Sequence, residues 1–127
     1  MDDEAIRNEF QRGLDLWHDD EADEAVATFS RLAAISPDDW RVRLMLGGYL
    51  QMSGHLAESE PHLRRATELR PISELASVAL FHVLWQRRYE NEAFAEMRRF
   101  LEVGEPKEYR RFIAEWHAEW LEKGLLT

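Results

Sequence analysis

The sequence predicts an all-α protein built as a short stack of antiparallel helix hairpins. Three observations support this prediction. Apolar residues recur every three or four positions along most of the 127 residues, as they do on one face of an amphipathic helix. Similar residues recur at an offset of 34 positions, which is typical of repeat proteins. Three of the four prolines, which a helix interior does not tolerate well, fall near the ends of the repeating units.

The internal period appears when the chain is compared with itself. A first shift of 34 residues aligns small, apolar and proline positions: Gly13 with Gly47, Leu16 with Leu50, Phe29 with Leu63, and Pro37 with Pro71. A second shift aligns Leu46 with Leu80, Leu50 with Leu84, and Ser59 with Ala93. Pro71 misses by one residue and meets Pro106 instead. The period predicts three similar hairpins.

The first hairpin is expected to begin near Asp3. Its first helix carries an apolar stripe, which consists of Ile6, Phe10, Leu14 and Trp17. A polar turn over residues 18–21 leads to a second helix over residues 23–36, which Pro37 ends.

The second hairpin starts with a helix over residues 40–52 that is apolar nearly all round, which predicts burial on most sides. Gly47 and Gly48 lower its helix propensity, so we expect them to let a neighbouring helix approach closely. The partner helix is predicted over residues 57–70. Pro61 fits near its start, where the missing N–H would be unpaired anyway.

The third hairpin follows Pro71 and ends at Gly104, with its turn at Arg87 and Arg88. One further amphipathic helix is predicted over residues 107–123, with an apolar stripe that includes Tyr109, Phe112, Trp116 and Trp120. A lone helix after the last hairpin is expected to cover the exposed end of the stack.

These residues resemble the tetratricopeptide repeat. The middle unit matches the family pattern at Leu46, Gly47, Leu50, Ser59, Leu63 and Pro71, and the first matches it at Gly13, Leu16, Ala25, Phe29 and Pro37. The third unit is degenerate, because Phe81 replaces the glycine. The resemblance implies one domain over residues 1–127: a right-handed superhelical stack of repeats at about 6–39, 40–73 and 74–106, with a capping helix at about 107–123.

The resemblance also implies a groove, because the first helix of each repeat lines the concave surface in this family. Mapped onto this chain, the groove residues are Arg7, Phe10, Leu14 and Trp17; then Arg41, Leu44, Gly48 and Gln51; then Val78, His82, Trp85 and Gln86, with His18, Met52 and Leu75 beside them. The Lys, Asn and Arg set with which the best-known groove of the family binds a peptide carboxylate is absent. Its places hold Phe10, Leu14, Met45, Leu75 and Ala79. We therefore expect an apolar, aromatic groove that suits an amphipathic helix or a hydrophobic segment.

Composition narrows the function classes. The formal net charge of −9 disfavours binding to a nucleic-acid backbone. The first residues lack the features of a secretory signal, and no apolar run could span a bilayer, so we expect a cytoplasmic protein that does not bind membranes. There is no cysteine, and no residues have the spacing of a nucleophile–base set, a phosphate loop or a metal site. The sequence predicts no enzymatic activity, cofactor or metal.

Two questions stay open at this level. The aromatic residues Phe10, Trp17 and Trp85 fit either partner-binding anchors or core between helices. The chain fits either a non-catalytic adaptor or chaperone-like module that binds another protein, or a homodimeric assembly protein. In the second case the terminal helices would associate. Trp116 and Trp120 are expected to pack on the third hairpin, with a dimer surface as the alternative.

Overall fold

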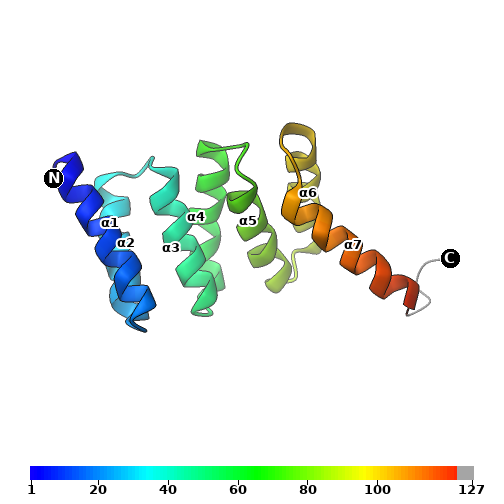
Figure 1. Cartoon of the computed structure of the whole chain (residues 1–127), viewed down its shortest axis with the longest axis horizontal. Helices are drawn as coiled ribbons and strands as arrows, with labels where there is room; N and C mark the ends of the chain where they lie inside the picture. Colours follow the sequence, from blue (N-terminus) through cyan, green and yellow to red (C-terminus); the bar gives the residue numbers. More distant parts are fainter. Residues whose placement is uncertain (123–127) are drawn as a thin grey trace.

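The computed structural model describes residues 1–122, without the side chains of residues 120 and 121. Within this range the chain forms seven α-helices: α1 (Asp3–His18), α2 (Ala22–Ile35), α3 (Trp40–Met52), α4 (Leu56–Leu69), α5 (Glu74–Gln86), α6 (Glu90–Val103) and α7 (Lys107–Glu122). The helices stand side by side in a row, with α1 at one end and α7 at the other (Figure 1). The predicted all-α fold is confirmed.

Consecutive helices pair as hairpins, α1 with α2, α3 with α4 and α5 with α6, and α7 packs on α5 (Figure 1). The predicted ranges 23–36 and 57–70 each begin and end one residue later than α2 and α4. The last residue of the predicted capping helix, Lys123, lies outside the described residues. None of the helices described here is both long and apolar enough to cross a membrane.

The three hairpin turns share one backbone geometry. Each contains a residue with positive φ, and these residues stand 34 positions apart: Asp20 (63°), Gly54 (83°) and Arg88 (65°). In each turn the next amide donates a hydrogen bond of 2.8 Å to a carbonyl five residues earlier: Glu21 to Leu16, His55 to Leu50, and Tyr89 to Leu84. Such bonds satisfy carbonyl groups that the end of a helix leaves free. The sequence period is therefore also a period of the backbone.

Of the two adjacent glycines in α3, one brings the helices of the second hairpin together. A Cβ atom on Gly47 would lie 2.6 Å from Leu63 of α4, so no larger residue fits there without a shift. Ser59 of α4 is also fully buried, and its hydroxyl donates a 2.6 Å hydrogen bond to the Gly47 carbonyl. A Cβ on Gly48 would meet nothing within 4 Å, so the prediction of a close approach was right for Gly47 and wrong for Gly48.

The interior consists of two apolar clusters. The first joins α1, α2 and α3 around Phe29 and Tyr49, whose rings meet edge to face at 5.5 Å. The second joins α3 to α7 around Phe81, which stands where the first two repeats have glycine. The centroid of the Phe81 ring lies no more than 6.0 Å from the ring centroids of Trp85, Phe94 and Trp116. The degenerate third repeat thus replaces a small residue with an aromatic centre on which α7 packs.

Polar contacts fix the start of α7 to α5. The carboxylate of Glu74 accepts hydrogen bonds from the backbone amides of Lys107, Glu108 and Tyr109, at 3.1, 2.9 and 3.2 Å. A carboxylate at this place satisfies amides that have no partner within the helix, and it interacts favourably with the helix dipole. Glu74 therefore caps α7 across the tertiary structure.

Candidate functional site

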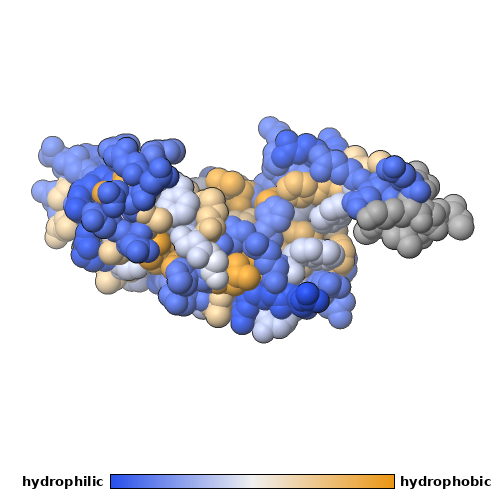
Figure 2. Space-filling view, turned by 90° about the horizontal axis from the view of Figure 1, so that it is seen from below, coloured by the Kyte–Doolittle hydropathy of each residue, from blue (hydrophilic) through white to orange (hydrophobic). Residues whose placement is uncertain are grey.

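An apolar cavity of about 250 Å³ lies between α3 and α5. Five residues of the predicted groove line it, namely Leu44, Gly48, Gln51, Val78 and His82, together with Met45, Tyr49, Met52, Leu75 and Ala79. Apolar patches come to the surface in the middle of the molecule, and the outline of the molecule dips between the two ends (Figure 2). The structure thus brings together groove residues from the second and third repeats.

The cavity has a buried floor and an exposed rim. Leu44 and Val78 are only 5 % and 8 % exposed, because they also belong to the core between α3 and α5. Met52 and Leu75 are 60 % and 63 % exposed and stand together at the edge of the cavity. The floor residues maintain the fold, so the rim residues are the ones available to a ligand.

Gly48 and His82 shape the wall of this cavity. Gly48 has no side chain and nothing faces its Cβ position, so the surface of α3 stays open there. Burial lowers the pKa of His82 below its ordinary value of 6.5. Its ring contacts Phe81 and Phe112 edge to face. A neutral imidazole adds a mainly apolar surface with one polar edge to the wall.

A side-chain hydrogen bond joins the C-terminal end of α3 to the C-terminal end of α5. The side-chain amide of Gln51 donates a 2.6 Å hydrogen bond to the side-chain carbonyl of Gln86. Trp85 beside it is 40 % exposed and stacks on Phe81 and Trp116. Trp85 and Gln86 therefore lie outside the cavity, and Trp85 both packs and stays partly accessible.

A second cavity, of about 290 Å³, lies between α1 and α3. Three residues of the predicted groove line it, Arg7, Phe10 and Arg41, together with Ile6, Gln11 and Asp39. The Asp39 carboxylate accepts hydrogen bonds from the backbone amides of Arg41 and Val42, at 3.0 and 3.5 Å, and so caps α3. Within residues 1–122 neither Arg7 nor Arg41 forms an ion pair or a side-chain hydrogen bond. Apolar side chains also line this cavity, but two arginines stand at its border.

Leu14 and Trp17, also predicted for the groove, are partly buried between α1 and α3. The Trp17 ring stacks on Tyr49 at 4.1 Å, with 3° between the ring planes. Phe10 meets Phe29 edge to face at 5.1 Å. The aromatic residues of α1 thus contribute to packing, while Phe10 also borders the second cavity.

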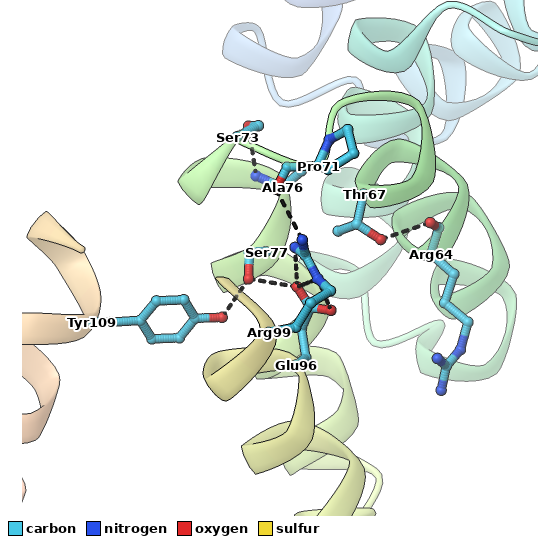
Figure 3. A network of polar contacts seen from close by, with 9 residues as sticks. All are labelled: Arg64, Thr67, Pro71, Ser73, Ala76, Ser77, Glu96, Arg99 and Tyr109. Carbon is cyan, nitrogen blue, oxygen red and sulfur yellow. Dashed lines mark hydrogen bonds and ion pairs between the residues drawn. The ribbon is translucent and has the colours of Figure 1, made fainter. Parts of the chain in front are cut away.

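A polar network joins α5, α6 and α7 away from the groove (Figure 3). The Ser77 hydroxyl donates to Glu96 at 2.6 Å and lies 2.7 Å from the Tyr109 hydroxyl. Arg99 pairs with the same Glu96 carboxylate at 2.7 Å and donates to the Pro71 carbonyl at 3.0 Å. Nothing in the sequence indicates that Ser77 meets Tyr109, because the two residues stand 32 positions apart on different helices.

In the part of the chain that the structure describes, no three His, Asp or Glu side chains gather as metal ligands would. The side chain of Trp120, proposed above for a dimer surface, lies outside the described residues. The face of α1, α3 and α5 thus carries two cavities, and the second differs from the first by the two arginines at its border.

No model of a known protein family matches the sequence, and no curated protein matches it. Comparison with solved structures does find similar folds. The chain is similar to the Yersinia enterocolitica type III secretion chaperone SycD in complex with a peptide of the translocator YopD. The TM-score is 0.78 at 15 % identity, with 96 % of this chain and 93 % of that chain covered.

A second SycD structure, described as an alternative dimer, gives a TM-score of 0.76 at 15 % identity, with 96 % and 92 % covered. A MamA mutant gives 0.71 at 24 % identity, with 80 % of this chain and 74 % of that chain covered. The structure of MamA AMB-1 gives a TM-score of 0.70 at 23 % identity, with 77 % of this chain covered. The match covers 54 % of that MamA chain, about half of its length. At these identities the likeness establishes the fold, a superhelical stack of tetratricopeptide-like helix hairpins.

Proposed function

We propose that this protein is a non-catalytic binding module, of the adaptor or chaperone-like kind, which holds a segment of a partner protein in the apolar cavity between α3 and α5. The observation that carries the proposal is the exposed rim of that cavity, Met52 and Leu75. Exposed apolar side chains that border a hollow are typical of a surface that another protein covers.

The size of the cavity fits apolar anchors of a peptide. A volume of about 250 Å³ accommodates one or two large aliphatic or aromatic side chains. Covering Met52 and Leu75 as well removes further apolar surface from water, worth about 1 to 2 kcal/mol for each residue. An apolar segment, extended or helical, with two or three such side chains supplies the complementary surface.

The likeness to SycD supports the same reading. That protein is described as a chaperone, and its structure contains a peptide of the translocator YopD. We assign the chain, by analogy of fold, to the tetratricopeptide-like proteins, with repeats at about 6–39, 40–73 and 74–106 and a capping helix at about 107–123 in one domain. Its cytoplasmic location, and its lack of catalytic activity and nucleic-acid binding, stay predictions from the sequence.

A random library of 12-residue peptides displayed on phage tests this function. We expect the protein to enrich peptides that carry two or three large apolar residues. The variant Met52→Glu with Leu75→Glu is expected to lose them, because a carboxylate on the rim opposes apolar burial. Leu101→Glu on α6, at a position 40 % exposed, is the matched control and should bind normally.

Circular dichroism shows that each variant is folded, and Met52→Ser with Leu75→Ser replaces the first variant if it is not. Binding that survives both substitutions in folded protein would refute the cavity as the binding site.

A second candidate function is a homodimeric assembly protein. One observation favours it: Ile113 on α7 is 40 % exposed, although it lies on the helix that covers the end of the stack. Light scattering coupled to size exclusion distinguishes the two candidates. The binding module is expected to be a monomer of 15.0 kDa, whereas the assembly protein would be a dimer that Ile113→Glu dissociates.

A further inference from the structure

The face formed by α1, α3 and α5 changes in chemistry from one end to the other. Positions 34 residues apart occupy equivalent places on these three helices, so Arg7, Arg41 and Leu75 form one row across the face. The first two residues of this row are cations and the third is the exposed apolar rim of the α3–α5 cavity. The face therefore has a basic end and an apolar end.

The basic end is available to a ligand. Other arginines of the chain already hold carboxylates: Arg64 pairs with Glu60 and Glu92, and Arg65 with Asp38 and Glu68. Among residues 1–122, Arg7 and Arg41 have no such partner, although carboxylates outnumber Lys and Arg by 25 to 16 in the sequence. Both border the same cavity of about 290 Å³.

One carboxylate lines the same cavity. Asp39 accepts hydrogen bonds from the first backbone amides of α3 and keeps its charge, so the two arginines leave the lining with one positive charge in excess. Two guanidinium groups beside one hollow can bind a carboxylate through several charge-assisted hydrogen bonds. The cavity thus offers a place for one or two acidic side chains.

The geometry points to a partner segment in which acidic residues stand next to apolar anchors. This inference rests on the proposed function and specifies its ligand: the anchors enter the α3–α5 cavity, and the carboxylates reach Arg7 and Arg41. The two cavities lie on opposite sides of α3 and are also offset along it, because Asp39 and Arg41 line the second cavity whereas residues 44–52 line the first. An interhelix distance of about 8–10 Å and this offset, at about 1.5 Å per residue, give a separation of about 10 to 15 Å. An extended peptide covers this distance in about three to five residues, which sets the spacing between acidic residue and first anchor.

The sign of the charge makes this inference easy to test. The protein carries a formal net charge of −9, so its average field repels an acidic peptide and attracts a basic one. A preference for acidic residues would therefore have to come from a local cationic site. Random surface attraction would give the opposite preference.

The test uses the same library of random 12-residue peptides, selected in parallel on the wild-type protein and on Arg7→Gln with Arg41→Gln. We expect wild-type selection to enrich Asp or Glu about three to five positions from the first apolar anchor, and the variant to keep the anchors but lose the acidic residues. For one selected peptide, replacing its acidic residues with Gln should weaken binding to the wild type about 5- to 20-fold, and to the variant less than about 2-fold. Arg98→Gln with Arg110→Gln, at exposed positions elsewhere, is the control.

The outcomes separate the two proposals. Enriched apolar peptides with no acidic preference, or with a basic one, would overturn the polarised ligand and leave the proposed function standing. The proposed function itself would be overturned if the wild-type protein enriched no apolar peptides. It would also be overturned if Met52→Glu with Leu75→Glu enriched the same apolar peptides as the wild type. Light scattering gives a further outcome. If the wild-type protein is a dimer, and Met52→Glu with Leu75→Glu or Arg7→Gln with Arg41→Gln dissociates it, the occupant is a second copy of the chain and the inference is overturned.

Discussion

The hydroxyl of Ser77 on α5 lies 2.7 Å from the hydroxyl of Tyr109 on α7, and both residues are fully buried. The contact links the third hairpin to the helix that covers it (Figure 3). Because the same Ser77 hydroxyl also donates to Glu96, one small side chain holds α5, α6 and α7 in a fixed relationship. The end of the stack therefore depends on polar bonds as well as on apolar packing.

Tyr109→Phe tests that link. Removing the hydroxyl loses the bond to Ser77, while Ser77 keeps Glu96 as an acceptor, so we expect a loss of about 1 kcal/mol in the free energy of unfolding. Chemical denaturation measures it. Tyr89→Phe is the control, because Tyr89 is 42 % exposed and its hydroxyl is only 3.4 Å from Arg87. Equal losses in the two variants would mean that the buried bond adds no stability.

Stability at high pH gives a second prediction. Burial is the main cause that raises the pKa of Tyr109 above its ordinary value of 10.0. In the unfolded chain the phenol loses its proton at about pH 10, whereas in the folded protein it keeps the proton. The unfolded state then binds fewer protons, so stability is complete below this pH and falls as the pH rises above it.

Denaturation at a series of pH values should show this decline. The decline should be smaller in Tyr109→Phe, though not absent, because burial also raises the pKa of Tyr49. An unchanged slope in the variant would contradict the assignment to Tyr109.

The two adjacent glycines of α3 should respond oppositely to the same change. Gly47→Ala places a Cβ 2.6 Å from Leu63 and should destabilise the protein by about 1 to 3 kcal/mol, as overpacking does. Gly48→Ala meets nothing and should stabilise it by about 0.5 to 1 kcal/mol through helix propensity. Thermal denaturation of the two variants, compared with the wild type, measures both changes in stability. Destabilisation by both substitutions would mean that α3 is enclosed on both faces.

The hairpin turns offer another matched pair. Arg88 adopts a φ of 65°, a region that costs a residue with a Cβ about 1 kcal/mol, so Arg88→Gly should stabilise the third hairpin by about that amount. Gly54 has a φ of 83° in the equivalent turn, so Gly54→Ala should destabilise the second hairpin similarly. The shift of the melting temperature in each variant measures both effects. A destabilising Arg88→Gly would show that the Arg88 side chain makes a contact worth more than the backbone strain.

The repeat architecture could be predicted from the sequence because it depends on local and periodic signals. Apolar spacing gives the helices, and prolines such as Pro37 and Pro71 mark their ends. The tertiary choices could not be predicted in the same way. Gly47 and Gly48 have identical propensities, and only the packing of α4 decides which one faces Leu63.

The candidate groove stays a prediction, and the structure adds what the sequence pattern does not contain. Of the residues at equivalent positions on the first helices of the repeats, Leu44, Gly48 and Val78 line one cavity, and Arg7 and Arg41 line another. The pattern does not separate the buried floor from the exposed rim, because burial depends on the neighbouring helices. Trp17 and Trp85 also stack on other rings, which the pattern does not indicate.

We propose that a partner segment binds in the cavity between α3 and α5. The most direct test is an NMR titration of methyl-labelled protein with a peptide selected from the random library. If the peptide binds in this cavity, we expect the methyl resonances of Met45, Met52 and Leu75 to shift in a saturable way, while those of Leu101 and Ile113 stay in place. Shifts confined to Leu101 or Ile113 would place the binding surface on the outer helices and would contradict the account.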